Sequence, residues 1–297
     1  MRAYVTGGLG FVGGWLREHL ETSGDDVKIV DMDVDVTDAD QVRDSIVGNA
    51  PEVVYHLAGL AHVGRSWTDP GPTFAVNALG TLNVLQGAAA CDVPPRVILV
   101  SSAEVYGSAG REPVNEKAEL RPVSPYAASK VAAEFLGLQA FLGRGVPVIR
   151  VRPFNHVGPG QAPDFVVSAL AKRIVEAEQA GGGDVAIGNL EARRDFTDVR
   201  DVVRAYRLIA EHGEPGEVYN VASGSALAVS DVADRLVALA AVPVRLVQDP
   251  SLVRPVEVPV FLGDASRLVE ATGWAPQVPL EKTLADVLES WRSKLSS

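Results

Sequence analysis

The chain has 297 residues with a formal net charge of −11, and it is long enough to bury a core in one large or two medium domains. Its 47% hydrophobic and 22% charged residues argue against disorder, and the acidic balance argues against nucleic acid or an anionic membrane as a partner. One cysteine, no apolar segment of about 20 residues and no visible signal peptide together predict a cytoplasmic protein.

The first half of the chain alternates short apolar strands with longer helical patterns. Strands are predicted at residues 3–6, 27–31, 52–59, 96–107 and 147–155, and helices at 11–24, 39–49, 73–92 and 125–145. The apolar strands do not alternate with polar residues, as expected where helices cover both faces of a parallel sheet. We therefore predict an α/β fold with a Rossmann-like, doubly wound parallel sheet.

Proline and glycine become frequent after residue 153, and the predicted elements become less regular. This change favours a second, smaller α/β lobe. We predict a dinucleotide-binding domain over residues 1–152, with some later elements interleaved, and a substrate-binding lobe mainly over residues 153–297.

The stretch "TGGLGFVGGWLREHL" contains a glycine pattern between the first strand and the first helix. Gly7, Gly10 and Gly13 permit a tight turn and a close backbone approach to a pyrophosphate at the start of the helix, where Phe11 and Val12 lie. We therefore predict that these five residues contact a dinucleotide.

Asp31 ends the second strand, about 20 residues after the glycine pattern. A carboxylate at this place can accept a hydrogen bond from a ribose hydroxyl. Asp35 and Val36 are predicted beside the adenine. No lysine or arginine occurs between Asp31 and Asp40, which favours NAD(H), with NADP(H) as the alternative if another loop supplies an arginine. The acid-rich stretch that begins at Asp31 does not form a calcium-binding loop, because Val36 and Val42 occupy the positions where such a loop needs glycine and glutamate. We predict no metal site.

The segment "SPYAASK" places Tyr126 and Lys130 one helical turn apart, on the same face of the predicted helix. An exposed tyrosine and a solvated lysine would give the same pattern. The preceding strand, however, ends in Ser101 and Ser102 at the sheet edge where ligands bind. In a hydride-transfer enzyme, Lys130 would lower the tyrosine pKa and hold the nicotinamide ribose, Tyr126 would move the proton, and Ser102 would hydrogen-bond the reacting oxygen.

Six motifs together resemble the extended short-chain dehydrogenases/reductases, the NAD-dependent epimerase/dehydratase family that modifies sugar nucleotides. They are "TGGLGFVG", "HLAG", "NALGTLNVL", "SSAEVYG", "YAASK" and "RPFNHVGPGQ". The resemblance covers essentially the whole chain and implies that Leu57, Ala58 and Gly59 also contact the cofactor. It further implies a homodimer, in which the helices containing "NALGTLNVL" and "SPYAASK" form a four-helix bundle with a second subunit.

The second half resembles the subgroup that acts on GDP-mannose-derived sugars, through "RPFNHVGPGQ", "IGNLEARRDFTDVRDVVRAY", "GEVYNVASG" and "RPVEVP". The resemblance implies that Asn155 contacts the substrate diphosphate and that Arg194 and Arg254 neutralise it. Glu257 would accept from a ribose hydroxyl, and Lys172 is a weaker candidate for the same pocket. Arginine suits phosphate oxygens, and an acidic protein needs such a local cluster to hold a dianion.

The implied reaction is NAD(P)H-dependent reduction of the C4 keto group of a GDP-linked 4-keto-6-deoxy sugar. Two related enzymes remain as alternatives: a 4,6-dehydratase with Glu104 as the base at C5, and a C4 epimerase that uses Tyr126 and Ser102. A nucleotide-sensing regulator on the same fold is the non-enzyme alternative. The residues leave open the stereochemistry at C4 and the choice of GDP over UDP or dTDP.

Overall fold

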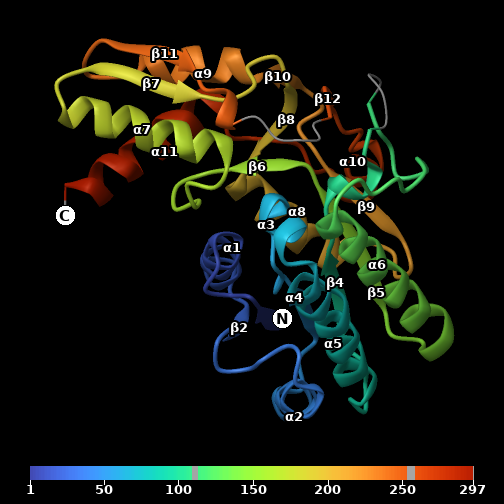
Figure 1. Ribbon diagram of the computed structural model, residues 1–297. Helices are drawn as coiled ribbons and strands as arrows, with labels where there is room; N and C mark the ends of the chain where they lie inside the picture. The colour runs from blue at the N-terminus through green and yellow to red at the C-terminus, as the bar shows by residue number, and fades with distance from the viewer. Residues whose placement is uncertain (109–112, 253–257, 297) are drawn as a thin grey trace.

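The computed structural model describes residues 1–108, 113–252 and 258–296 (Figure 1). Its centre is a parallel sheet of six strands in the order β2-β1-β3-β4-β5-β9. The strands are β1 Arg2–Thr6, β2 Asp26–Val30, β3 Val53–His56, β4 Arg96–Val100, β5 Val148–Pro153 and β9 Val218–Val221. The predicted Rossmann-like fold class is confirmed. The strand order reverses at β1, so a ligand crevice is expected at the carboxyl ends of β1 and β3.

Helices cover both faces of this sheet. On one face lie α1 Phe11–Thr22 and α8 Val199–His212, and on the other lie α2 Ala39–Asn49, α5 Gly80–Ala89 and α6 Pro125–Arg144. Successive strand residues point to opposite faces. Val5 of β1 therefore packs in one apolar cluster with Leu16 of α1, whereas its neighbour Tyr4 belongs to another cluster with Ile46 of α2.

The helix predicted at residues 73–92 is divided in the structure. After α3 Val63–Thr68 come α4 Pro70–Phe74, a π-helical segment η1 Ala75–Leu79, and then α5. Single π turns inside helices are frequent at functional sites. Here the π turn contains Asn77, whose side-chain amide accepts from Leu60 N at 2.7 Å and donates to Leu60 O at 3.1 Å.

The second lobe is built on smaller sheets. One has the order β10-β8-β12 with β6 beside β8, and another pairs β7 with β11. Its strands are β6 Asn155–Val157, β7 Gly183–Ile187, β8 Arg193–Asp198, β10 Ala226–Ala228, β11 Val244–Gln248 and β12 Val260–Phe261. The further helices are α7 Val166–Gln179, α9 Val229–Ala238, α10 Ser266–Thr272 and α11 Leu280–Leu295, with 3₁₀ turns η2 Ala103–Tyr106 and η3 Pro250–Leu252.

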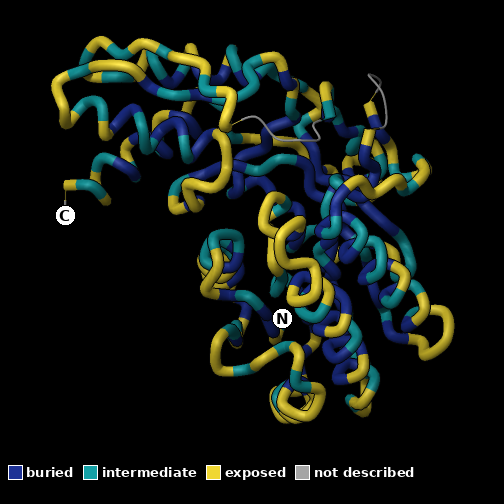
Figure 2. The backbone as a smooth tube through the Cα atoms, in the orientation of Figure 1, coloured by how far each residue is buried: buried dark blue, intermediate teal, exposed yellow. Residues whose placement is uncertain are grey.

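Separate apolar clusters lie in the two lobes. Helices α7, α9 and α11 bury Ile174, Leu236 and Leu288 in one apolar cluster, whereas α10 buries Leu268 in the cluster under the six-stranded sheet. In Figure 2, buried residues run through both lobes and through the region where the lobes meet. In the part of the chain that the structure describes, no helix has the length and apolar character that crossing a bilayer requires.

An ion pair lies buried between α6 and β5. Arg152 Nη2 lies 2.6 Å from Glu134 Oε2, and both side chains are at most 4% exposed. The phenol of Tyr106 accepts from Arg152 Nη1 at 2.9 Å and donates to Asn220 Oδ1 at 2.7 Å. Ser101, directly after β4, donates to Glu134 Oε1 at 2.5 Å. The pair thus joins α6 to three neighbouring parts of the sheet.

Replacing Arg152 by methionine should lower the free energy of unfolding by about 3–5 kcal/mol, because Glu134 would remain buried without its cation. Urea unfolding followed by circular dichroism measures the change. Arg121→Met is the matched control, since Arg121 pairs with Glu119 on the surface with both side chains at least 70% exposed. Equal stability losses in the two variants would contradict this account.

Candidate active site

The glycine loop joins β1 to α1 and packs closely on the loop after β3. Gly7 has a φ of +68°, and a Cβ there would lie 2.8 Å from Ala58 N. A Cβ on Gly13 would lie 2.3 Å from Gly7 O, so the first turn of α1 needs glycine as well. Gly10 is exposed and forms the N-cap of α1 without a side chain, ahead of Phe11. This exposed backbone at a helix N-terminus fits a dinucleotide pyrophosphate.

Asp31 follows β2 and faces the same loop. Its Oδ2 accepts from Leu9 N at 2.9 Å, so the carboxylate lies at the edge of the glycine loop. The Asp35 carboxylate instead accepts from Thr37 N and Oγ1, both at 2.8 Å, and these bonds lower its pKa. Val36 packs on Gly80 of α5, where a Cβ would come within 2.9 Å of Val36 Cγ2.

The loop after β3 carries Leu57, Ala58 and Gly59, next to the glycine loop. Ala58 N donates to Thr6 Oγ1 at 3.2 Å. A Cβ on Gly59 would meet Asn77 Oδ1 at 3.0 Å and Lys130 Nζ at 3.3 Å. The loop therefore runs directly over the lysine of α6, and the structure brings this predicted cofactor segment to the predicted catalytic helix.

The side chains of Ser102, Tyr126 and Lys130 line one cavity of about 200 Å³. Ser102 caps the 3₁₀ turn η2 by accepting from Glu104 N at 3.2 Å. Tyr126 lies in the first turn of α6, where Ser124 is the N-cap, and Lys130 lies one turn further on. Lys130 Nζ donates to Val100 O at 2.9 Å, which holds it against the end of β4.

Burial shifts the pKa values of this pair in opposite directions. It raises the pKa of Tyr126 to about 12, although a hydrogen bond with Ser102 acts against the rise and the Glu104 charge adds to it. Burial lowers the pKa of Lys130 to about 8, opposed by the charge of Glu134. The pKa of Tyr126 thus rises, rather than falling as expected from the neighbouring Lys130, because desolvation of the phenol is the largest influence on it.

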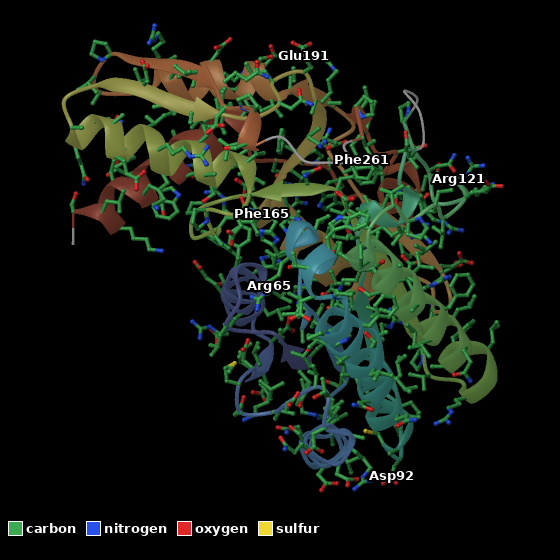
Figure 3. The ribbon with its side chains drawn as sticks, in the orientation of Figure 1. Arg65, Asp92, Arg121, Phe165, Glu191 and Phe261 are labelled. Carbon is green, nitrogen blue, oxygen red and sulfur yellow. The ribbon has the colours of Figure 1, made fainter. Side chains whose placement is uncertain are left out.

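The cavity continues toward the second lobe. Val12, from the first turn of α1, and Gly59, from the loop after β3, line it, and so does Glu104, two residues after Ser102. Phe165 and Phe261 line it from the second lobe, and Figure 3 shows Phe165 between the two lobes. The arrangement places a hydroxyl, a phenol and an ammonium around one space, whose wall includes the apolar side chains of Val12, Phe165 and Phe261.

A second cavity of about 330 Å³ lies in the other lobe and shares part of its wall with the first. Asn155 lines both cavities, and Arg194 lines the second together with Asn189. Arg194 Nη1 donates to Val258 O at 2.8 Å. The structure thus brings Asn155 and Arg194 together, as predicted from the resemblance to known sugar-nucleotide enzymes. Arg254 and Glu257 lie outside the described residues.

Lys172 is not brought to this cavity. It pairs with Glu176 at 3.3 Å one turn further along α7, and its ammonium lies 6.0 Å from the ring centre of Trp291 on α11. The next residue, Arg173, lines the cavity and donates to Ala186 O at 2.8 Å. One residue on a helix turns the side chain by about 100°. Val166 and Leu170 line the same cavity, so Arg173 continues the side of α7 that faces it.

Loops from both lobes meet where the cavities join. His62, in the loop after β3, accepts from Arg65 N at 2.8 Å through Nδ1, and its Nε2 lies 3.9 Å from Asp164 Oδ1. Both side chains line both cavities, as does Gln161. Sequence reasoning missed His62, Gln161 and Asp164, since no charge pattern marks them. His56 is buried, and its two ring nitrogens form hydrogen bonds with Thr6 and Thr81, so it has a packing role within the sheet.

Residues 29–287 match the family model for GDP-mannose 4,6 dehydratase, which covers most of the chain. The chain belongs to this family. A GDP-6-deoxy-D-mannose reductase of Pseudomonas aeruginosa is 36% identical over 99% of this chain and 98% of its own length. The predicted membership of the epimerase/dehydratase branch of the short-chain dehydrogenases/reductases is confirmed.

Solved structures of family relatives share the whole fold. The structure of RMD from Pseudomonas aeruginosa complexed with NADPH is 36% identical, with a TM-score of 0.90 over 99% of each chain. A UDP-glucose 4-epimerase of Thermotoga maritima with UDP-glucose is 27% identical, with a TM-score of 0.92 over 99% of this chain and all of that one. The family fold therefore extends through both lobes of this chain.

The lowered pKa of Lys130 predicts a rise in stability with pH. Between pH 8 and 10 Lys130 is protonated to a greater extent in the unfolded chain than in the folded one. The free energy of unfolding should therefore increase by about 2 kcal/mol over this range. Urea unfolding of the protein without ligands, compared with Lys130→Met across this range, isolates the contribution. A constant difference between the two proteins from pH 8 to 10 would refute the assignment.

Proposed function

We propose that the protein is an oxidoreductase that uses NAD(P)H to reduce the C4 keto group of GDP-4-keto-6-deoxy-D-mannose to GDP-D-rhamnose. The observation that carries the proposal is the meeting of Ser102, Tyr126 and Lys130 in one cavity that continues into a second, arginine-lined cavity. The full-length likeness to a GDP-6-deoxy-D-mannose reductase supports the substrate.

The cofactor would lie along the glycine loop. Gly7, Gly10 and Gly13 would approach its pyrophosphate, with Phe11 and Val12 at the helix N-terminus. Asp31 would accept from the adenosine ribose, and Asp35 and Val36 would flank the adenine. Leu57, Ala58 and Gly59 would lead to the nicotinamide side, where Lys130 would hold the ribose.

The bound nicotinamide would supply the hydride for the C4 carbon. Tyr126 would donate its phenol proton to the oxygen that becomes an alkoxide, while Ser102 would donate a hydrogen bond to the same oxygen. The raised pKa of Tyr126 keeps the phenol protonated at neutral pH, as a proton donor requires. The reverse reaction, an oxidation, would need the phenolate as its base.

Charge in the second cavity supports a nucleotide-linked substrate. Asn155 and Arg194 would contact the diphosphate, and Arg173 adds a guanidinium to the same wall. Among the cofactors, NAD(H) is favoured by Asp31 at the ribose position, with NADP(H) as the alternative, since the P. aeruginosa relative was solved with NADPH. A cytoplasmic location remains a prediction from the single cysteine.

One observation supports a second candidate, a GDP-mannose 4,6-dehydratase. Glu104 lines the cavity with Tyr126, and its charge acts on the tyrosine pKa. A carboxylate there has the chemistry of the base that removes a C5 proton. The family model, described as GDP-mannose 4,6 dehydratase, agrees with this candidate as well.

A coupled assay distinguishes the two. A known 4,6-dehydratase converts GDP-mannose to the keto sugar, this protein is added with NADH or NADPH, and nicotinamide absorbance is followed. We expect oxidation of the reduced cofactor and a deoxyhexose product identified by NMR. Keto sugar formed from GDP-mannose by this protein alone would instead identify the dehydratase, and inactivity with both would redirect the search to UDP- and dTDP-sugars.

In this assay Tyr126→Phe should lower kcat by about 10²–10⁴-fold, because the developing alkoxide loses its proton donor. The KM for the keto sugar should change little, since the ring remains in place. Tyr4→Phe is the matched control: its hydroxyl is also buried and donates to Ser45 at 2.7 Å, away from both cavities. Near-normal turnover by the Tyr126→Phe variant would show that Tyr126 is not the general acid.

We also propose a homodimer formed by α5 and α6 against the same helices of a second copy. Phe135 and Leu142 lie two turns apart on α6 and are 58% and 73% exposed, and Leu79, the last residue of η1 directly before α5, is 56% exposed. An apolar stripe of this kind is typical of a protein interface.

Phe135→Glu should convert the dimer to a monomer, because it would bury a carboxylate in an apolar interface. Sedimentation velocity over a concentration series measures the change. Val269→Glu, on the exposed side of α10, introduces the same charge away from the interface and should leave the dimer intact. A wild-type protein that sediments as a monomer at all concentrations, or a dimeric Phe135→Glu variant, would rule out the interface.

A further inference from the structure

Gln161 lies in the loop between β6 and α7, at the junction of the two cavities. It lines both of them, and the residue is only 5% exposed. The loop is anchored on either side: Trp15 Nε1 of α1 donates to Pro159 O at 3.0 Å, and Ser168 Oγ of α7 donates to Gln161 O at 2.6 Å. The side chain of Gln161 is therefore held at a fixed place between the lobes.

The orientation of the Gln161 amide follows from one hydrogen bond. Nε2 lies 3.0 Å from the backbone oxygen of His156. A carbonyl oxygen can only accept, so the amide must present its nitrogen there and its oxygen Oε1 on the other side. Oε1 is buried and has no hydrogen-bond partner among the described residues.

A buried acceptor without a partner is uncommon in folded proteins and calls for an explanation. Gln161 lines both cavities, but its Oε1 is itself covered, so a donor on a ligand completes its hydrogen bonding only when the neighbouring side chains move aside as the ligand enters. The same argument does not apply to Tyr55, whose unpartnered hydroxyl is packed in the core under the sheet.

His156 presents a second acceptor at the same junction. Its Nδ1 lies 3.3 Å from Phe154 O, so Nδ1 carries the proton, because the carbonyl cannot donate. Burial lowers the pKa of His156, which keeps the ring neutral. Nε2 is then an acceptor. The ring stacks on Phe11, with ring centres 6.1 Å apart, and the residue lines both cavities.

Two acceptors here disfavour phosphate oxygens, which are themselves acceptors, and favour a group with hydroxyl hydrogens. The junction lies between the cavity with Tyr126 and the cavity with Arg194. In a hexose that reacts at C4 and carries the diphosphate at C1, the intervening ring carbons bear hydroxyls. We propose that Gln161, together with His156, is a specificity-determining residue that accepts a hydrogen bond from the C2 or C3 hydroxyl of the hexose.

This inference rests on the proposed function and adds the residue that recognises a hydroxyl of the hexose ring. Calorimetric titration with GDP-mannose and with GDP tests it without turnover. Gln161→Met, of similar size, should weaken GDP-mannose binding about tenfold, which corresponds to about 1.4 kcal/mol, and change GDP binding by less than twofold. His156→Phe should have the same selective effect, because it keeps the stacking on Phe11 and removes the acceptor.

Gln179→Met is the matched control. Gln179 lies at the far end of α7, where its amide also donates to a backbone oxygen, that of Leu295, at 3.0 Å. Its replacement should leave both affinities unchanged. GDP-2-deoxymannose and GDP-3-deoxymannose identify the hydroxyl: the wild type should bind one of them about tenfold more weakly than GDP-mannose, and Gln161→Met should not distinguish that one from GDP-mannose.

The outcomes separate this inference from the proposed function. If the wild type reduces the keto sugar but Gln161→Met loses GDP and GDP-mannose affinity equally, or loses neither, the hydroxyl contact is wrong and the reductase stands. Equal binding of GDP-mannose and both deoxy sugars by the wild type would also overturn the contact, whether or not the variants fold. A wild type that binds neither GDP nor GDP-mannose would overturn the nucleotide class and the contact with it.

Discussion

The ion pair between Glu134 and Arg152 fixes the helix on which the candidate chemistry depends. Glu134 lies one turn after Lys130 on α6, and Arg152 comes from β5 at the centre of the sheet. Ser101, at the end of β4, donates to the same carboxylate, next to the residue that hydrogen-bonds Tyr126. A buried carboxylate and guanidinium tolerate little displacement, because each would lose its partner in a medium that cannot solvate it. The distances among Ser102, Tyr126 and Lys130 are therefore set by a pair that need not touch the substrate.

The same burial determines the charge in the cavity. Desolvation disfavours both the phenolate of Tyr126 and the ammonium of Lys130, so the tyrosine pKa rises while the lysine pKa falls. Glu134 opposes the second shift and keeps Lys130 largely charged near neutral pH. His56 lies near that ammonium and stays neutral, since burial and the Lys130 charge lower its pKa to about 3. The cavity thus places the Lys130 cation beside the protonated phenol of Tyr126, which suits a reaction that creates an alkoxide.

Local patterns predicted the parallel sheet, the glycine loop and the two residues of α6, because each depends on spacing within one strand–turn–helix unit. Features that depend on contacts between distant segments were not predictable in this way. The π turn at Asn77 follows from bonds to Leu60, 17 residues earlier. Lys172 and Arg173 are neighbouring cations on α7, and only Arg173 lies on the side that lines the cavity. Their charge does not show which of the two that is. Gln161 becomes a candidate only once its amide orientation and its burial between the lobes are known.

The junction between the lobes explains why two cavities would serve one ligand. The loop that carries Gln161 is bonded to α1 of the first lobe through Trp15 and to α7 of the second through Ser168. Any shift of one lobe against the other would move the Gln161 and His156 acceptors relative to Tyr126 on one side or to Arg194 on the other. A ligand gains the contacts of both cavities only if a hydroxyl-bearing ring links the reacting carbon to a diphosphate, as in a nucleotide sugar.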